Sequence, residues 1–229
     1  MSYSRRAVMA AIFLGWGSFL SWMALSGTMS RFLGPRTYWV AWFGAVTLLM
    51  TGAATTLNAF RSPGTRAGRA DWAGVILLSI PIALVLALPS PQLGAQAASR
   101  KAVGVGALSS FVPPPPKGGK LGLEEIHYAG LSREYADQVG ITEGADVDLV
   151  GFVTHPKKAK DGTYSLTRFY ISCCAADAVP YSVPVQAAED LDDDTWLKIT
   201  GTLGRGTQGF VVTPTAIEEI KEPSSPYLY

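Results

Sequence analysis

Cysteine is scarce in this 229-residue sequence, because only Cys173 and Cys174 are present and they are adjacent. Consecutive Cα atoms lie about 3.8 Å apart, whereas ordinary disulfides need Cα atoms about 4.4–6.8 Å apart. The sequence therefore excludes a framework of disulfides between its distant segments. A bond between the two neighbours would close a strained ring, so any such bond is expected to be reversible.

Charged side chains are absent from three long stretches, 7–30, 37–60 and 72–99. At about 1.5 Å per residue, each of the first two reaches about 36 Å as a helix and can cross a hydrocarbon core of about 30 Å. The third is expected to span the membrane over about 72–90, with a kink at Pro81. We therefore predict three transmembrane helices within residues 1–92, which anchor the chain in the lipid bilayer.

The Lys and Arg residues around these spans predict their orientation. One side carries five of them: Arg5, Arg6, Arg61, Arg66 and Arg69. The other side carries four: Arg31, Arg36, Arg100 and Lys101. This bias predicts a multi-pass cell-membrane protein with a cytoplasmic N-terminus and an extracytoplasmic C-terminal domain. The first span also has the basic start of a cleaved signal peptide, but its uncharged run is long for one and no clear cleavage site follows.

Motifs of common enzyme classes are missing. The sequence has no nucleophile motif, P-loop or dinucleotide fingerprint, and we predict that it is not an enzyme. Residues 100–229 hold 12 Lys or Arg and 17 Asp or Glu, against 7 and 1 in residues 1–99. This acidic region lacks the clustered positive charge that binds phosphates, so no nucleic-acid partner is expected. The basic run at 157–160 is predicted to be a solvated hairpin tip, and the acidic run at 189–194 lacks the order of a calcium loop.

Proline and glycine are concentrated in residues 93–122, which include four consecutive prolines and are predicted to be a linker. The domain that follows, 123–229, begins with a short helix or irregular segment over 123–139. It then alternates apolar and polar residues in four or five short segments with glycines at bends, a pattern typical of strands. We predict an all-β domain, a small OB-like barrel, with a small open sheet or a sandwich as alternatives.

Three interpretations of the cysteine pair remain open. On a regular strand, Cys173 would share the buried face of Phe169 and Ile171 as a small hydrophobe, and Cys174 would point away. If the strand breaks at residues 175–180, both thiols and the carboxylate of Asp177 can form one ligand or redox site.

Such a site would suit a soft metal such as zinc, with His155 as a possible extra ligand. A site with two cysteines and two histidines would also need His127, and the spacing matches no zinc motif. The third interpretation is a reversible disulfide between Cys173 and Cys174, although no C-x-x-C motif accompanies it.

The stretch LTRFYISCCAADAVPYSVPV, the strand WLKITGTL and the segment SGTMSRFLGPR between the first two spans resemble an uncharacterised bacterial membrane-protein family. Its members are usually described as subunits of a two-component membrane permease complex. Five residues fit its core pattern: Arg168, Cys173, Cys174, Ala176 and Asp177. The resemblance implies a larger, multi-spanning permease as partner, but no substrate and no role for the cysteines.

The small residues of the first two spans would let a partner helix approach closely. They are Gly15, Gly17, Ser21, Gly52, Ala53 and Ala54. We therefore expect a non-catalytic accessory subunit whose outward β domain caps or gates the permease, or presents a ligand to it. The alternative is a stand-alone cell-surface protein that uses the vicinal cysteines for metal binding or thiol redox chemistry.

Overall fold

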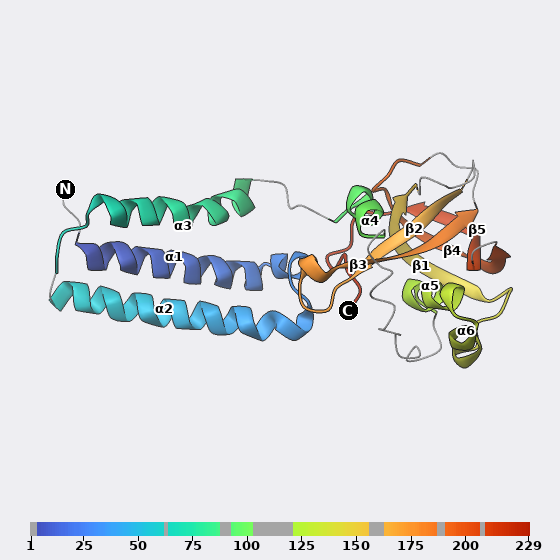
Figure 1. The fold of residues 1–229 in the computed structure, drawn as a ribbon, viewed down its shortest axis with the longest axis horizontal. Coiled ribbons are helices and arrows are strands. Elements are labelled where there is room, and N and C mark those ends of the chain that lie inside the picture. Colours follow the sequence, from blue (N-terminus) through green and yellow to red (C-terminus); the bar gives the residue numbers. More distant parts are fainter. Residues whose placement is uncertain are drawn as a thin grey trace. The chain divides into compact units, whose positions relative to one another are not determined.

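The computed structural model describes residues 4–61, 64–87, 93–102, 121–155, 163–186, 191–206 and 209–229. The chain divides into two compact units, Met1–Gln92 and Leu93–Tyr229. The first is helical and the second contains a β-barrel (Figure 1).

The helical unit consists of three long helices, α1 (Arg5–Leu25), α2 (Tyr38–Arg61) and α3 (Arg69–Ala87). Two single turns of 3-10 helix, η1 (Thr28–Arg31) and η2 (Pro35–Thr37), join α1 to α2. All three helices are long and apolar enough to cross a membrane. The predicted helical anchor is therefore confirmed.

Two glycines bring α1 and α2 into close contact. A Cβ atom added at Gly17 would lie 2.8 Å from Cγ of Leu49, and one added at Gly52 would lie 2.8 Å from Cγ of Leu14. Gly17 and Gly52 therefore serve the packing of the chain's own helices, which corrects the expectation that they await a partner helix. By contrast, a Cβ at Gly15 would meet nothing within 4 Å.

Helix α3 continues through Pro81 and has no buried residue. The proline lacks an N–H donor, so one carbonyl in the preceding turn loses its partner. In that turn, the indole Nε1 of Trp16 in α1 donates to the carbonyl of Leu78 at 3.1 Å. The carbonyl that loses its donor is that of Leu77, four residues before Pro81, so the Trp16 bond lies at the next carbonyl and connects α1 to α3 beside the proline.

The second unit contains five strands that form a closed barrel in the order β1-β2-β3-β5-β4. They are β1 (Asp146–Thr154), β2 (Thr163–Tyr170), β3 (Val179–Gln186), β4 (Trp196–Gly206) and β5 (Gly209–Glu219). β1 pairs antiparallel with both β2 and β4, and β3 meets β5 in parallel through Val185 and Val212. This is the strand order of an OB fold, so the predicted β-barrel class is confirmed and the open sheet and sandwich are excluded.

Inward-facing side chains of all five strands form the barrel core, since alternate residues of each strand face the interior. Its most buried members include Leu149, Val153, Leu166, Val183, Leu197, Ile199 and Val212. Helix α5 (Leu123–Leu131) lies against β3 and β5, and α6 (Arg133–Val139) follows it. α5 thereby covers the seam at which these two strands have their single registered pair.

Residues 93–102 do not belong to a linker, which corrects that part of the prediction. Helix α4 (Ala95–Ala102) lies in the barrel unit, and its Ala98 is buried in a cluster with Phe152, Phe169 and Ile171. The Asp194 side chain accepts a hydrogen bond from the backbone N–H of Ala95 at the start of α4. The four prolines lie in 103–120, outside the described residues, as does the predicted hairpin tip at 157–160.

Candidate functional site: the thiol turn between two strands

The segment that joins β2 to β3, residues 171–178, is called the thiol turn below. It contains one turn of 3-10 helix, η4 (Ala175–Asp177). The carboxylate of Asp177 accepts hydrogen bonds from the backbone N–H groups of Ser172 (3.0 Å), Cys173 (2.8 Å) and Cys174 (3.4 Å). These bonds fold the chain back on itself directly after β2. Strand alternation therefore stops before the cysteines.

The two cysteines are accessible rather than part of the core. Cys173 is exposed and Cys174 is half-buried, and both are free thiols. The interpretation of Cys173 as a small buried hydrophobe is therefore wrong. Cys173 is exposed because β2 ends at Tyr170, so the strand alternation that buries Phe169 does not extend to residue 173.

Both thiols and the carboxylate converge. The two Sγ atoms are 3.7 Å apart, and the ligand atoms of Cys173, Cys174 and Asp177 all lie within 4.8 Å of one another. A disulfide would need about 2.05 Å between sulfurs. Two sulfurs at about 2.3 Å from a tetrahedral zinc ion lie about 3.8 Å apart. The reduced thiols are thus already at the separation that a tetrahedral metal requires.

Asp177 also controls the protonation of Cys173. Its carboxylate hydrogen-bonds to the Cys173 thiol, and Cys174 adds a second hydrogen bond, so that the pKa of Cys173 rises to about 11. Partial burial would raise the pKa of Asp177, but hydrogen bonds from the Cys173 thiol and the backbone N–H groups outweigh it and lower that pKa. At neutral pH the site is therefore a thiol beside a carboxylate.

A lysine from α4 holds the other half of the thiol turn. Nζ of Lys101 donates to the carbonyls of Ala176 and Ala178 at 3.0 Å, and to that of Ala175 at 3.5 Å. Asp177 thus accepts hydrogen bonds from the backbone amides of the turn, and Lys101 donates hydrogen bonds to its backbone carbonyls. Sequence reasoning missed Lys101, because backbone carbonyls 74–77 residues away leave no signal in the residue pattern.

His155, the expected extra ligand, lies at the opposite end of β2. Its Nδ1 is 2.8 Å from Oδ1 of Asp193, and its ring packs against Tyr164 near the start of β2. The cysteines follow the other end of this eight-residue strand, about 26 Å away at about 3.3 Å per residue. The structure therefore does not bring His155 to the thiols.

His127 is also separate from the thiols. Its Nδ1 lies 2.8 Å from the carbonyl of Ser182 in β3, and burial lowers its pKa. A site with two cysteines and two histidines is therefore not formed. Within the described part of the chain, Cys173, Cys174 and Asp177 are the one group of three potential ligands close enough to hold a metal ion.

The base of the thiol turn is fixed by the C-terminal segment. Arg168 donates through Nε to the carbonyl of Pro226 at 3.1 Å and through Nη2 to that of Ser225 at 2.6 Å. The N–H of Ile171 donates to the carbonyl of Leu228 at 3.1 Å. Arg168 is thus a structural residue that positions the segment leading into the cysteines.

The fold and the site define a class: a barrel domain of OB type, in a chain with three candidate membrane-spanning helices, with a thiol and carboxylate turn between its second and third strands. Comparison with known families matches residues 115–229, half of the chain, to the DUF1980 C-terminal domain. The protein belongs to this family, which has no assigned function. No curated protein matches the sequence. The match covers α5, α6, the barrel and the thiol turn.

Proposed function

We propose that this protein is a non-catalytic accessory subunit of a membrane permease complex, whose barrel binds a soft metal such as zinc at the thiol turn and presents it to the permease. The observation that carries the proposal is the 3.7 Å separation of the Cys173 and Cys174 sulfurs beside the Asp177 carboxylate. The three apolar helices support attachment to a membrane complex.

The chemistry of the donor set favours a soft or borderline metal. Thiolates select zinc or copper(I), whereas magnesium and calcium prefer sites made entirely of oxygen. Cys173, Cys174 and Asp177 supply three ligands, so a tetrahedral ion would keep one open position. Because Cys173 is exposed, that position is open to a group from a partner, which suits transfer of the ion better than permanent storage.

Thiol redox chemistry is less well supported than metal binding. The thiolate is the reactive form in disulfide exchange, and the raised pKa of Cys173 keeps it protonated at neutral pH. Metal binding displaces that proton, so the same property makes affinity depend on pH. A stand-alone surface protein that binds metal at this turn is the second candidate, because all three ligands come from one chain.

The orientation proposed with this function places the N-terminus in the cytoplasm and the barrel outside it. Five arginines flank the spans on the N-terminal side, against four basic residues on the other side. A thiol turn outside the cytoplasm would bind ions before the permease imports them or after it exports them.

Co-purification tests the subunit role. The tagged full-length protein is purified from native membranes in mild detergent, and mass spectrometry identifies what accompanies it. We expect a multi-spanning permease in stoichiometric amount. Recovery of this protein alone would remove the subunit proposal and leave the stand-alone metal protein.

Metal analysis of the same preparations tests the site. Wild type, kept reduced, is expected to bind one zinc ion per chain, and the double variant Cys173→Ser with Cys174→Ser is expected to lose it while still recovering the permease. Ser172→Ala is the matched control, because it changes the neighbouring side chain and leaves all three ligands in place. Zinc retained by the double variant would contradict the assignment of the site.

A further inference from the structure

Helix α2 has three faces of different chemistry. Its buried residues, Ala45 and Gly52, lie on the side that packs against α1. A second face is large and apolar, with exposed fractions between 51% and 68%, and is formed by Phe43, Val46, Met50 and Leu57. At 3.6 residues per turn, these four lie within about 60° of one another around the helix. This apolar face has the composition expected of contact with lipid.

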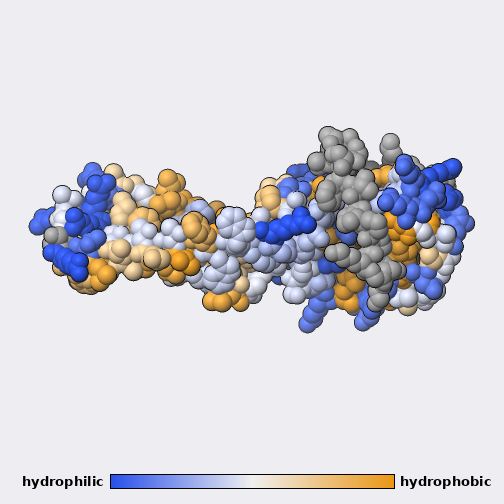
Figure 2. Space-filling view, turned by 90° about the horizontal axis from the view of Figure 1, so that it is seen from below, coloured by the Kyte–Doolittle hydropathy of each residue, from blue (hydrophilic) through white to orange (hydrophobic). Residues whose placement is uncertain are grey.

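The third face of α2 is polar, although the helix is a candidate membrane span. This polar face consists of Thr47, Thr51, Thr55 and Asn58, of which Thr55 is half-buried and the others are exposed. Its members lie within about 80° of one another, and about 100° around the helix from the apolar face. Figure 2, seen from the side on which α2 lies in Figure 1, shows pale residues as well as orange ones along the helical unit. Polar side chains of membrane helices form hydrogen bonds to other helices, so this face is expected to contact protein.

The hydroxyl groups of the polar face donate within α2 itself. Oγ1 of Thr51 donates to the carbonyl of Thr47 at 2.8 Å, and Oγ1 of Thr55 donates to the carbonyl of Thr51 at 2.7 Å. Their oxygens keep lone pairs and can still accept hydrogen bonds. Among the described residues, the side-chain amide of Asn58 has no hydrogen-bond partner. A molecule that complements this face must therefore bring donors for the hydroxyl oxygens and a partner for the amide.

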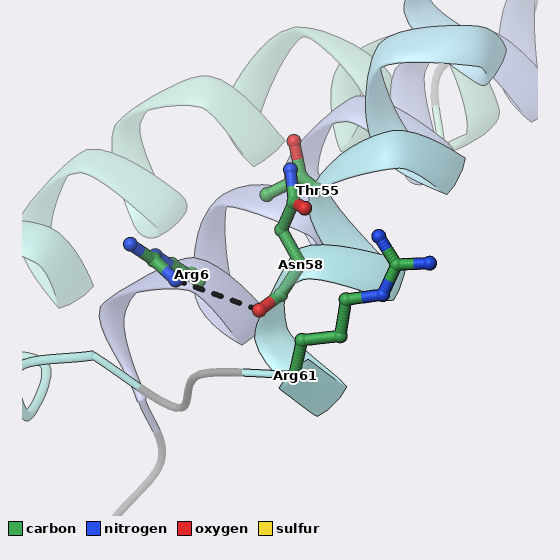
Figure 3. A pocket seen from close by; sticks show the side chains of 4 residues that line it. All are labelled: Arg6, Thr55, Asn58 and Arg61. Atoms are coloured by element: carbon green, nitrogen blue, oxygen red, sulfur yellow. Dashed lines mark hydrogen bonds between the residues drawn. The ribbon is translucent and has the colours of Figure 1, made fainter.

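The polar face ends in an open hollow of about 450 Å³, whose described lining is formed by Arg6, Thr55, Asn58 and Arg61. Figure 3 shows the side chain of Asn58 extending toward Thr55, whereas the guanidinium group of Arg61 points away from Arg6. The hollow thus continues the polar face to the last turn of α2 and leaves room there for the side chains of a neighbouring molecule.

A second copy of this chain would complement the polar face poorly. Two copies have the same orientation in a membrane, so a symmetric pair would place identical faces together. The hydroxyl oxygens of Thr51 and Thr55 would then face other acceptors, and the two Arg61 side chains would lie at the same end. Residues 1–92 contain one acidic residue, Asp71, whose Oδ1 is 3.0 Å from Nε of Arg5, so it does not balance them. A helix of different sequence suits this face better.

We propose that the polar face of α2 docks a transmembrane helix of a second protein. That helix carries small residues, which allow close approach, and side-chain N–H donors that bind Thr51, Thr55 and Asn58. In the proposed complex this helix belongs to the permease, and that identification rests on the proposed function. The docking face itself is separate from the thiol turn and does not depend on metal binding.

Photo-crosslinking of the full-length protein in native membranes tests the face. Thr51→p-benzoylphenylalanine places the probe on the polar face. Ala53→p-benzoylphenylalanine is the matched control, because Ala53 is exposed at nearly the same depth, about 160° around the helix. We expect the probe at residue 51, and not the control, to crosslink to the permease that co-purifies with the wild type. Equal yields from both positions, a crosslink between two copies of this chain, or adducts with lipid alone would overturn the proposal.

The double variant Thr51→Leu with Asn58→Leu measures what the face contributes. It should lower the yield of co-purified permease about tenfold, because two positions are lost and each hydrogen bond between membrane helices contributes about threefold. Val46→Leu with Ala53→Leu, which adds leucine away from the polar face, is the control and should leave the yield unchanged. An unchanged yield in the first double variant would overturn the proposal, and if that variant fails to fold, the crosslinking result decides.

The two experiments separate the docking face from the proposed function. Co-purification of the permease without a crosslink from residue 51 would overturn the docking face alone. A wild-type preparation that lacks the permease would overturn the subunit role and this docking partner together.

Discussion

Asp177 organises both the backbone of the thiol turn and the protonation of Cys173. In Asp177→Asn, the pKa of Cys173 should fall from about 11 toward its ordinary value of 9.0, since the neighbouring carboxylate is gone. We expect faster alkylation of Cys173 by iodoacetamide at pH 9, followed by mass spectrometry. Loss of hydrogen bonds to a charged acceptor should also lower the free energy of unfolding by about 1–3 kcal/mol.

The exposed Asp146→Asn is the control, and it should leave alkylation unchanged. Unaltered alkylation in Asp177→Asn would show that the carboxylate does not hold the thiol proton. The two pKa shifts make stability depend on pH in opposite directions. The pKa of Asp177 is lowered, so its contribution is lost as pH falls below 3.8, whereas that of Cys173 is lost as pH rises from 9 toward about 11.

Glu124 makes the stability of the barrel unit depend on pH. Burial, with a smaller contribution from the charge of Glu125, raises its pKa to about 7 against the opposing charge of Arg168. The folded state thus favours the protonated acid, and this contribution is lost as pH rises from 4.5 through about 7.

Glu124→Gln should therefore be more stable than wild type at pH 8 by roughly 1–2 kcal/mol, a value reduced for partial solvent exposure, and similar to it at pH 4. Urea unfolding of residues 93–229 at several pH values measures the difference. Glu134→Gln is the control, and a parallel pH profile for Glu124→Gln and wild type would refute the assignment.

The candidate ligands of the thiol turn could be chosen from the sequence, but their geometry could not. Cys173, Cys174 and Asp177 stood out because thiols are rare and a carboxylate follows closely. The exposure of Cys173 depends on where β2 ends, and three backbone hydrogen bonds to Asp177 decide this. The separation of His155 depends on the hairpin register between β1 and β2, which a single sequence does not specify.

Helix α4 is expected to stabilise the thiol turn from outside the strands. In Lys101→Met, the carbonyls of the turn lose a charged donor, which should lower the free energy of unfolding by about 1–3 kcal/mol and speed hydrogen exchange of the Cys173 and Cys174 amides. The neighbouring Arg100→Met is the matched control. Equal exchange in both variants would mean that α4 does not hold the turn.

The contact between α1 and α2 depends on glycine. Gly52→Ala places a methyl group 2.8 Å from Leu14, so the helices must separate, at a cost of about 1–3 kcal/mol. Tryptophan fluorescence during SDS-induced unfolding measures this. Gly74→Ala on α3 meets nothing within 4 Å and should be neutral or slightly stabilising. Similar unfolding of both variants would rule out close packing at Gly52.

The elements whose residue pattern reflects contact with lipid, water or the core were predictable from the sequence. Helix α4, which depends on contacts with residues far away in the sequence, was not. Long uncharged runs predicted α1, α2 and α3, because a bilayer core excludes charge and requires helices. Alternation predicted strands and a barrel. Helix α4 was missed because Ala95–Ala102 follows no long pattern, and Asp194, which caps it, lies 99 residues away.

At the scale of the whole molecule, the cysteines report the orientation of the chain. They are its only thiols, and Cys173 is exposed. A membrane-impermeant maleimide added to intact cells should label the wild type before lysis, if the barrel is extracytoplasmic as proposed. The double variant Cys173→Ser with Cys174→Ser has no thiol and is the control that should not be labelled. Labelling only after lysis would reverse the orientation.

The single parallel pair between β3 and β5 has a consequence for folding kinetics. The hairpins β2–β3 and β4–β5 pair strands that are neighbours in sequence. Closure between β3 and β5 pairs Val185 with Val212, which are 27 residues apart, and forms only this one registered strand pair. Local hairpins form quickly, and non-local pairing must first overcome chain entropy. We expect barrel closure to be a late step. The thiol turn lies within the first of these hairpins, so partly folded chains would already contain it.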